Sequence, residues 1–315
     1  MVFFVAATIV LLLMTSSLYV FVVAFVRGKE QPWLDEEAIK KTAVGKYYDY
    51  MVSASKWLEQ HNASDICTSS DDGLLLHGLF VSQENARGTV ILAHGYRSTP
   101  LLDFGAALPY YYKRGFNLLI PDQRSHGKSQ GKLITFGIKE SKDMQKWIRY
   151  HNEVYGTIPI LLFGISMGAS TMLYLADKEL PINVKGIIAD CGFTSPKAII
   201  SHVFRSVTHL PGRISIFITN IFTKAFGGFG LQDCDTLRVL QRSRLPVLLV
   251  HGTKDGFVPC EMTKCAYSIC NSPKEILLVD GADHGTSFLV APEKYANTVD
   301  TFINNYILDT EDKDE

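Results

Sequence analysis

The sequence predicts an α/β protein: a mostly parallel, doubly wound sheet with an inserted helical cap and an N-terminal transmembrane helix. Short runs rich in branched aliphatic residues alternate with helical segments, as in a parallel sheet buried on both faces. The interval between Cys191 and Arg244 is longer than one crossover helix requires. The first 26 residues carry no charged side chain. We interpret the long interval as a cap and the first segment as a membrane span.

Residues 1–27 are predicted to form the transmembrane anchor. A helix over residues 2–26 would be about 37 Å long at about 1.5 Å per residue, enough to cross a hydrocarbon core of about 30 Å. The alternative is a cleaved signal peptide, with Val22 and Ala24 as the small residues before the cut. The missing basic n-region and the long apolar stretch favour the anchor.

Basic residues flank this segment on one side only. Arg27, Lys29, Lys40 and Lys41 follow it, and none precedes it. The positive-inside rule therefore predicts a single-pass protein of the cell membrane with the remaining chain on the cytoplasmic side.

Residues 28–70 are predicted to be a linker that contains an amphipathic helix. Apolar residues recur there at helical spacing from residue 36 to 60: Ile39, Val44, Tyr47, Met51, Ala54 and Leu58. The folded domain is expected over residues 71–308, with the cap at about 192–243. A second crossover helix with a long loop is the alternative to a cap. Residues 309–315 form an acidic tail.

Seven strands are expected in the domain, at residues 74–80, 88–93, 116–121, 158–163, 184–189, 246–250 and 275–279. Each is a short run of mostly aliphatic residues, and helical segments separate most of them.

Composition excludes some functions. The formal net charge is −1, and no basic block suggests a nucleic-acid partner. The six cysteines are scattered through a chain large enough to fold without disulfides, so reduced thiols are expected. Cys260, Cys265 and Cys270 are five residues apart, which places them about 140° apart on a helix. With no CxxC pair present, we predict no metal site.

The sharpest motif is GISMG at residues 164–168, which follows the predicted strand 158–163 and precedes a helical run. A serine at such a strand-to-helix elbow lies exposed on a strained turn, and glycines two residues away let the backbone pass close by. Ser166 is therefore the candidate nucleophile, rather than an ordinary helix N-cap serine.

The same elbow predicts half of an oxyanion hole. The amide of Met167 opens the helix and would face the developing negative charge. A second donor is expected from the turn after strand 88–93, and the amide of Tyr96 is the candidate. His94 in this turn is expected to support the loop rather than act as the base.

The acid and base are expected late in the chain. Asp255 follows the strand at 246–250, and His284 follows the strand at 275–279. Parallel strands end at one edge of the sheet, so both can reach Ser166. His284 would accept the serine proton, and Asp255 would orient the imidazole. Asp190 and Asp283 are the alternative acids. His126 is expected to be structural and Cys191 a buried thiol.

Together these motifs resemble the α/β-hydrolase superfamily: HG at 94–95, DQRSHGKS at 122–129, GISMG at 164–168, DGFVP at 255–259 and His284. They look most like its branch of bacterial, often membrane-anchored serine-aminopeptidase-like hydrolases, esterases and lipases. The resemblance covers residues 74–308. It implies hydrolysis of esters, thioesters, monoacylglycerols or peptide bonds on one triad, with no cofactor or metal.

The function we expect from these residues is that of a serine hydrolase that cleaves carboxylic esters of amphiphilic or acyl substrates through an acyl-enzyme intermediate. A serine peptidase or thioesterase on the same triad is the alternative. A peptidase needs carboxylates in the cap to hold the substrate amine, and residues 199–229 contain none. A non-catalytic binding module of the same fold is the alternative of another class. Expected partners are a lipid-like ester and the membrane.

Overall fold

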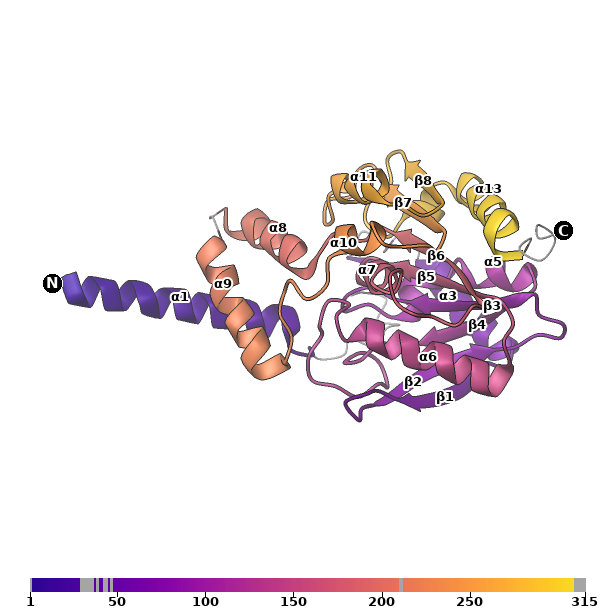
Figure 1. Cartoon of the computed structure of the whole chain (residues 1–315), viewed down its shortest axis with the longest axis horizontal. Coiled ribbons are helices and arrows are strands. Elements are labelled where there is room, and N and C mark those ends of the chain that lie inside the picture. The colour runs from indigo at the N-terminus through magenta and orange to yellow at the C-terminus, as the bar shows by residue number, and fades with distance from the viewer. Residues whose placement is uncertain are drawn as a thin grey trace.

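The computed structural model describes residues 2–28, 37, 40–41, 45, 48–209 and 212–308. Its centre is an eight-stranded sheet in the order β1-β2-β4-β3-β5-β6-β7-β8 (Figure 1). β1 and β2 are antiparallel, as are β2 and β4, and every other neighbouring pair is parallel. The predicted α/β class with a mostly parallel sheet is confirmed. The strands are β1 Ser64–Ser69, β2 Leu75–Val81, β3 Gly88–Ala93, β4 Phe116–Pro121, β5 Ile160–Ile165, β6 Val184–Asp190, β7 Val247–Gly252 and β8 Lys274–Val279.

The seven predicted strands are present, with ends shifted by up to two residues. The sequence did not reveal β1, which pairs with β2 from Ser64 opposite Phe80 to Ser69 opposite Leu75. This edge strand is polar, and Ile66 is its one buried residue. Hydrophobic patterning therefore could not detect it, and the sheet extends into the segment predicted as a linker.

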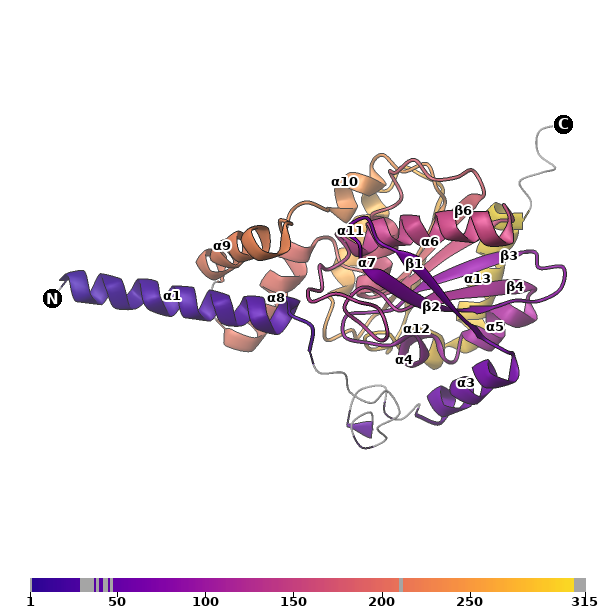
Figure 2. The same ribbon diagram turned by 90° about the horizontal axis from the view of Figure 1, so that it is seen from below.

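Helices cover both faces of the sheet (Figure 2). On one face, α4 (Pro100–Phe104), α5 (Leu108–Lys113) and α13 (Pro292–Ile303) pack over side chains such as Val90 and Leu92. On the other, α6 (Glu140–Tyr155), α7 (Met167–Leu173), α10 (Thr236–Leu240) and α11 (Cys260–Ile269) pack over Ile91 and Ala93. Successive residues of β3 thus point into opposite cores, which explains its unbroken apolar sequence. The C-terminal elements also include α12 (Ser287–Val290) and η3 (Asn304–Leu308).

Extra helices separate β6 from β7, as the sequence predicts. α8 (Pro196–Thr208), α9 (Arg213–Phe222) and the short π-helix η2 (Thr223–Gly227) extend away from the sheet (Figure 1). We call these three elements the cap. α10 returns to the sheet, because Val239 and Leu240 lie in its core. The predicted cap boundaries of 192–243 therefore include one helix that belongs to the sheet layer.

The N-terminal helix α1 (Val2–Phe25) projects beyond the cap in both views (Figures 1 and 2). Its span Phe3–Phe25 is long and apolar enough to cross a membrane, with a mean hydropathy of 2.3, although a signal sequence has the same properties. Its last turns are not separate from the domain. Phe21 and Phe25 are buried with Phe136 and Phe229, and Ile134 donates a main-chain hydrogen bond to Phe25.

The helix predicted from the apolar spacing at residues 36–60 is observed as α3 (Tyr48–Gln60). Ala54 and Leu58 are buried, and Leu58 packs into the same core as Leu108. This segment is therefore attached to the domain rather than free. Ile39, Val44 and Tyr47 lie outside the described residues, as do the residues 309–315 expected to form an acidic tail.

Candidate active site

Ser166 occupies a strained turn between β5 and α7. Its backbone has φ of 57° and ψ of −117°, a conformation that L residues rarely adopt. The flanking glycines are required by close packing. A Cβ on Gly164 would lie 2.2 Å from the carbonyl oxygen of Gly168, and one on Gly168 would lie 1.8 Å from that of Ala93. The GxSxG spacing is thus a consequence of three backbone segments passing within contact distance of one another.

The structure brings the three predicted residues together at the carboxyl edge of the sheet. The hydroxyl of Ser166 lies 2.9 Å from Nε2 of His284, and Nδ1 of His284 lies 2.7 Å from Oδ2 of Asp255. The residues follow β5, β8 and β7 respectively. Ser166 is nearly buried, whereas about a quarter of the His284 side chain is exposed. This hydrogen-bonded chain can carry a proton away from the serine oxygen.

The carboxylate of Asp255 is fully buried and fully engaged. Its Oδ1 accepts hydrogen bonds from the amides of Phe257 and Val258, both at 2.8 Å, and Nε2 of His251 lies 3.1 Å from Oδ2. Burial acts to raise the pKa of Asp255, but the hydrogen bonds from His251 and His284 outweigh it and hold the pKa well below its usual range. Asp255 therefore stays ionised and can stabilise a charged imidazole.

The two alternative acids have other partners. Asp190 is buried, and its Oδ1 accepts a hydrogen bond of 3.0 Å from the hydroxyl of Ser287. Burial raises the pKa of Asp190 to about 6. Asp283 uses Oδ1 to accept from the amides of Gly256 and His284, so it shapes the loop around the histidine. Asp255 is the acid that contacts the imidazole of His284.

The turn after β3 lies beside Ser166. A Cβ built on Gly95 would lie 3.3 Å from Cβ of Ser166. Asp103 accepts hydrogen bonds from the Gly95 amide and the Ser98 hydroxyl, which fixes this turn. Within the described part of the chain, neither the Tyr96 amide nor the Met167 amide donates a hydrogen bond to another protein group. Their role as oxyanion donors stays a prediction.

His94 and His126 occupy structural positions. His94 is buried, its Nε2 accepts from the Gln123 amide at 3.0 Å, and its Nδ1 lies 2.9 Å from the carbonyl of Gly95. Burial lowers the pKa of His94 to about 3, so the ring is neutral. Nε2 of His126 accepts from the Arg97 amide at 3.0 Å. Both rings hold main-chain loops around the site.

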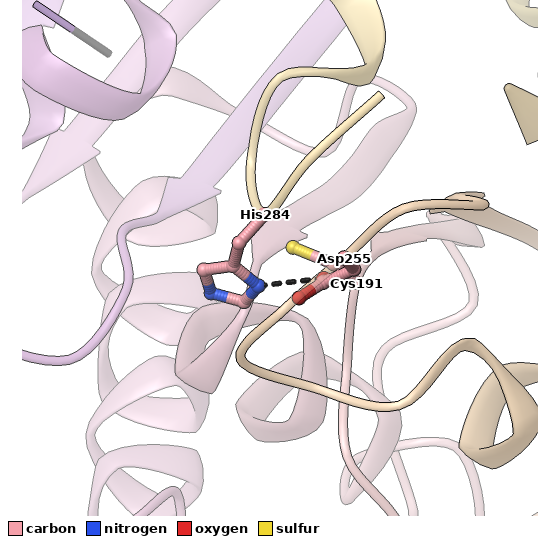
Figure 3. A group of neighbouring side chains, drawn as sticks. All are labelled: Cys191, Asp255 and His284. Carbon is pink, nitrogen blue, oxygen red and sulfur yellow. Dashed lines mark hydrogen bonds and ion pairs between the residues drawn. The ribbon is translucent and has the colours of Figure 1, made fainter. Parts of the chain in front are cut away.

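Cys191 lies closer to the site than its sequence context indicates. One donor atom each of Cys191, Asp255 and His284 falls within a group no wider than 4.8 Å, and the side chains face one another (Figure 3). Burial raises the pKa of the Cys191 thiol well above its usual value, so the sulfur is protonated and a poor nucleophile. Asp255 and His284 already bond to each other. Cys191 is therefore a neutral thiol that lies beside the Asp255–His284 pair.

Sequence reasoning missed two supporting residues. His251 contacts Asp255 and the hydroxyl of Thr263, and it is the penultimate residue of β7, so its position near a strand end was a usable signal. Asp103 fixes the turn at Gly95 from α4. No motif marks Asp103, because its role depends on a helix folding back over the turn.

Known proteins resemble this chain in sequence. Residues 84–225 match the family model described as serine aminopeptidase. The chain is 27% identical over 248 residues to the uncharacterized protein YqkD of Bacillus subtilis, covering 78% of this chain and 81% of that protein. It is 23% identical over 263 residues to the uncharacterized protein YfhR of Escherichia coli, covering 79% and 83%.

Solved structures resemble it in fold. The esterase Pf2001 of Pyrococcus furiosus superposes with a TM-score of 0.65 at 23% identity, covering 79% of this chain and 94% of that one. The esterase domain of a Rhodothermus marinus protein superposes with a TM-score of 0.56 at 17% identity, covering 78% and 99%. At these identities the likeness shows the fold.

Proposed function

We propose that the chain is a serine hydrolase of the α/β-hydrolase superfamily that cleaves carboxylic esters of amphiphilic substrates. One observation carries the proposal: a hydrogen-bonded chain from Ser166 through His284 to an ionised Asp255, at 2.9 and 2.7 Å, on a strained elbow. The hydrogen-bonded side chains and the match to the serine aminopeptidase family model also support hydrolase activity in the broader sense.

The proposed reaction forms and then hydrolyses an acyl-enzyme. Ser166 Oγ attacks the ester carbonyl while its proton moves to Nε2 of His284, and Asp255 stabilises the resulting imidazolium. The amides of Met167 and Tyr96 hold the oxyanion. Collapse of the tetrahedral intermediate breaks the bond to the alcohol, which takes the proton from His284. Water, activated by the neutral His284, then releases the acid and regenerates Ser166.

The surroundings of the site favour an apolar acyl group. Met167, Tyr96 and Phe193 lie in the same apolar cluster as the cap side chains Ile200 and Ile216. A peptidase is the second candidate, because the matching family model is that of serine aminopeptidases. Residues 199–229 contain no Asp or Glu. This part of the cap therefore offers no carboxylate to bind the free amine of a peptide substrate.

The test uses the full chain in detergent micelles, since removal of α1 would expose the cluster around Phe25. We expect hydrolysis of p-nitrophenyl esters, with a maximum at medium or long acyl chains, and no release of p-nitroaniline from aminoacyl anilides. Ser166→Ala should abolish the activity. Anilide cleavage without ester cleavage would favour the peptidase. No cleavage and no fluorophosphonate labelling of Ser166 would indicate a binding module.

We also propose that α1 anchors the protein as a single-pass helix with the domain on the cytoplasmic side. Arg27 follows the helix directly, and basic residues next to a membrane span favour its cytoplasmic side. Protease added outside intact cells should leave the domain uncut, and cleavage before cell lysis would reverse the orientation.

A further inference from the structure

The cap carries large apolar side chains on its outer surface. α9 is apolar on both sides: Ile216 is buried toward the domain, whereas Ile214, Phe217 and Ile221 recur at helical spacing and are exposed. Phe217 is 65% exposed. A helix that is apolar on all sides is typical of an apolar environment rather than water. Val207 at the end of α8 and Phe226 in η2 are also exposed.

α9 lies directly against the candidate membrane helix. The hydroxyl of Thr219 donates to the carbonyl of Ser17 at 3.3 Å, and the hydroxyls of Ser16 and Ser215 are 3.5 Å apart. Phe21 of α1 contacts Phe222, with ring centroids 6.2 Å apart. α9 is therefore fixed alongside the part of α1 from Ser16 to Phe21.

The length of α1 decides how deep this contact lies. In α1, 14 residues precede Ser16, from Val2 to Thr15, and they span about 21 Å at about 1.5 Å per residue, whereas the hydrocarbon core is about 30 Å thick. The free part of α1 is thus about 9 Å too short to cross a membrane. A crossing α1 must include the part that contacts α9, and α9 then lies within the nearer leaflet.

Charge on the cap fits an anionic surface. Between Cys191 and Gln232 the sequence contains four Lys or Arg residues and no Asp or Glu. These four side chains are exposed: Lys197, Arg205, Arg213 and Lys224. Basic side chains beside an apolar helix face favour the headgroup region of anionic lipids.

We propose that the outer face of the cap, formed by α8, α9 and η2, is embedded beside α1 in the nearer leaflet of an anionic lipid bilayer. Phe217, Ile221 and Phe226 contact acyl chains, and the four cationic side chains contact headgroups. The embedding of the cap does not depend on the proposed function. If the protein is an ester hydrolase, as proposed above, the embedding also implies that its ester substrate is a lipid of that leaflet.

The site is physically joined to this surface. The hydroxyl of Tyr96 donates to the carbonyl of Val23 at 3.1 Å, and the guanidinium of Arg97 donates to the carbonyls of Val23 and Val26, both at 2.8 Å. The turn beside Ser166 is therefore bonded to the end of α1. A lipid that leaves the bilayer next to α1 therefore meets the turn that lies beside Ser166.

The experiment places a fluorescent side chain on the proposed face of the full-length protein. Phe217→Trp is compared with Ile182→Trp, whose site is 92% exposed and precedes β6 at the opposite edge of the sheet. Each is reconstituted in vesicles of phosphatidylcholine and phosphatidylglycerol, with and without lipid brominated in its acyl chains. The signal of the unsubstituted chain, which has three tryptophans, is subtracted.

We expect the indole at position 217 to be quenched by brominated lipid at least threefold more than the control, and to be protected from aqueous iodide. Quenching by iodide alone would overturn the proposal, and so would protection from both quenchers, which indicates a second copy or another protein on this face. Quenching that is equal in vesicles of phosphatidylcholine alone would overturn the role of anionic lipid.

The substrate is tested separately from the embedding. The protein should hydrolyse an ester lipid placed in its own vesicles at least tenfold faster than the same lipid in added vesicles. Equal rates would overturn supply from the leaflet. Since lipid quenching needs no activity, a protein that is quenched but hydrolyses no ester contradicts the proposed function and not the embedding.

Discussion

At the carboxyl edge of the sheet, side chains far apart in the sequence are fixed by hydrogen bonds, whereas the cap and α1 are joined mainly by packing of apolar groups. Asp255, for example, accepts hydrogen bonds from two main-chain amides and contacts two histidines. Between α1 and α9, the contacts are ring pairs such as Phe21 with Phe222 and a few hydroxyl bonds. The first region is held by directional hydrogen bonds within the protein, whereas the stability of the second depends on what surrounds it.

The largest expected effect tests the chemistry of the sheet edge. Ser166→Ala and Asp255→Asn should each lower kcat about 10⁴-fold or more, because the first removes the proposed nucleophile and the second removes the carboxylate proposed to orient His284. Asp283→Asn is the matched control, since Asp283 bonds to main-chain amides and not to the imidazole. It should lower kcat less than tenfold. Equal losses of kcat in Asp255→Asn and Asp283→Asn would show that the contact with the imidazole does not distinguish the two aspartates.

The next effect tests the packing of the elbow. Gly168→Ala places a Cβ 1.8 Å from the carbonyl oxygen of Ala93, so the elbow must open, at a cost of about 4 kcal/mol or more. Gly156→Ala is the control: its φ is 88° and its ψ is 176°, and nothing lies within 4 Å, so only backbone strain of about 1–3 kcal/mol applies. Urea denaturation of both variants measures the difference. A similar midpoint for the two would show that the elbow can relax.

A smaller effect concerns pH. Burial raises the pKa of Asp190 from 3.8 to about 6. The folded state therefore binds the proton more tightly, and stability falls by about 3 kcal/mol as pH rises from about 4 to about 6. Asp190→Asn keeps an acceptor for Ser287 and cannot ionise. The Tm of this variant relative to the original chain should rise across that window, and a constant difference would contradict the buried charge.

The smallest effect is expected on the cap. Phe217→Ser removes a side chain that is 65% exposed, so the free energy of unfolding in detergent should change by no more than about 0.5 kcal/mol. Phe229→Ser, which removes a buried ring that contacts Phe25, should cost about 3 kcal/mol. Chemical denaturation in one detergent compares them. Similar losses would show that the outer face of α9 is part of a packed core.

The sequence predicted the parts of this molecule that depend on local constraints. The closeness of Ser166, Asp255 and His284 could be predicted because the elbow needs glycines at fixed spacing and because parallel strands end at one edge. β1 was missed because one of its six residues is buried. The docking of α1 on the cap was missed because a uniformly apolar helix gives no sign of which side chains will contact protein. Asp103 was missed because its contact with Gly95 exists only after the chain has folded.

The backbone of Ser166 also has a consequence for directed evolution. A φ of 57° with ψ of −117° suits glycine far better than serine. A serine at this position therefore lowers the stability of the fold but places a hydroxyl there. A library screened for heat tolerance alone should accumulate glycine at position 166 and lose turnover. A library screened for turnover should retain serine there and gain its heat tolerance at other positions.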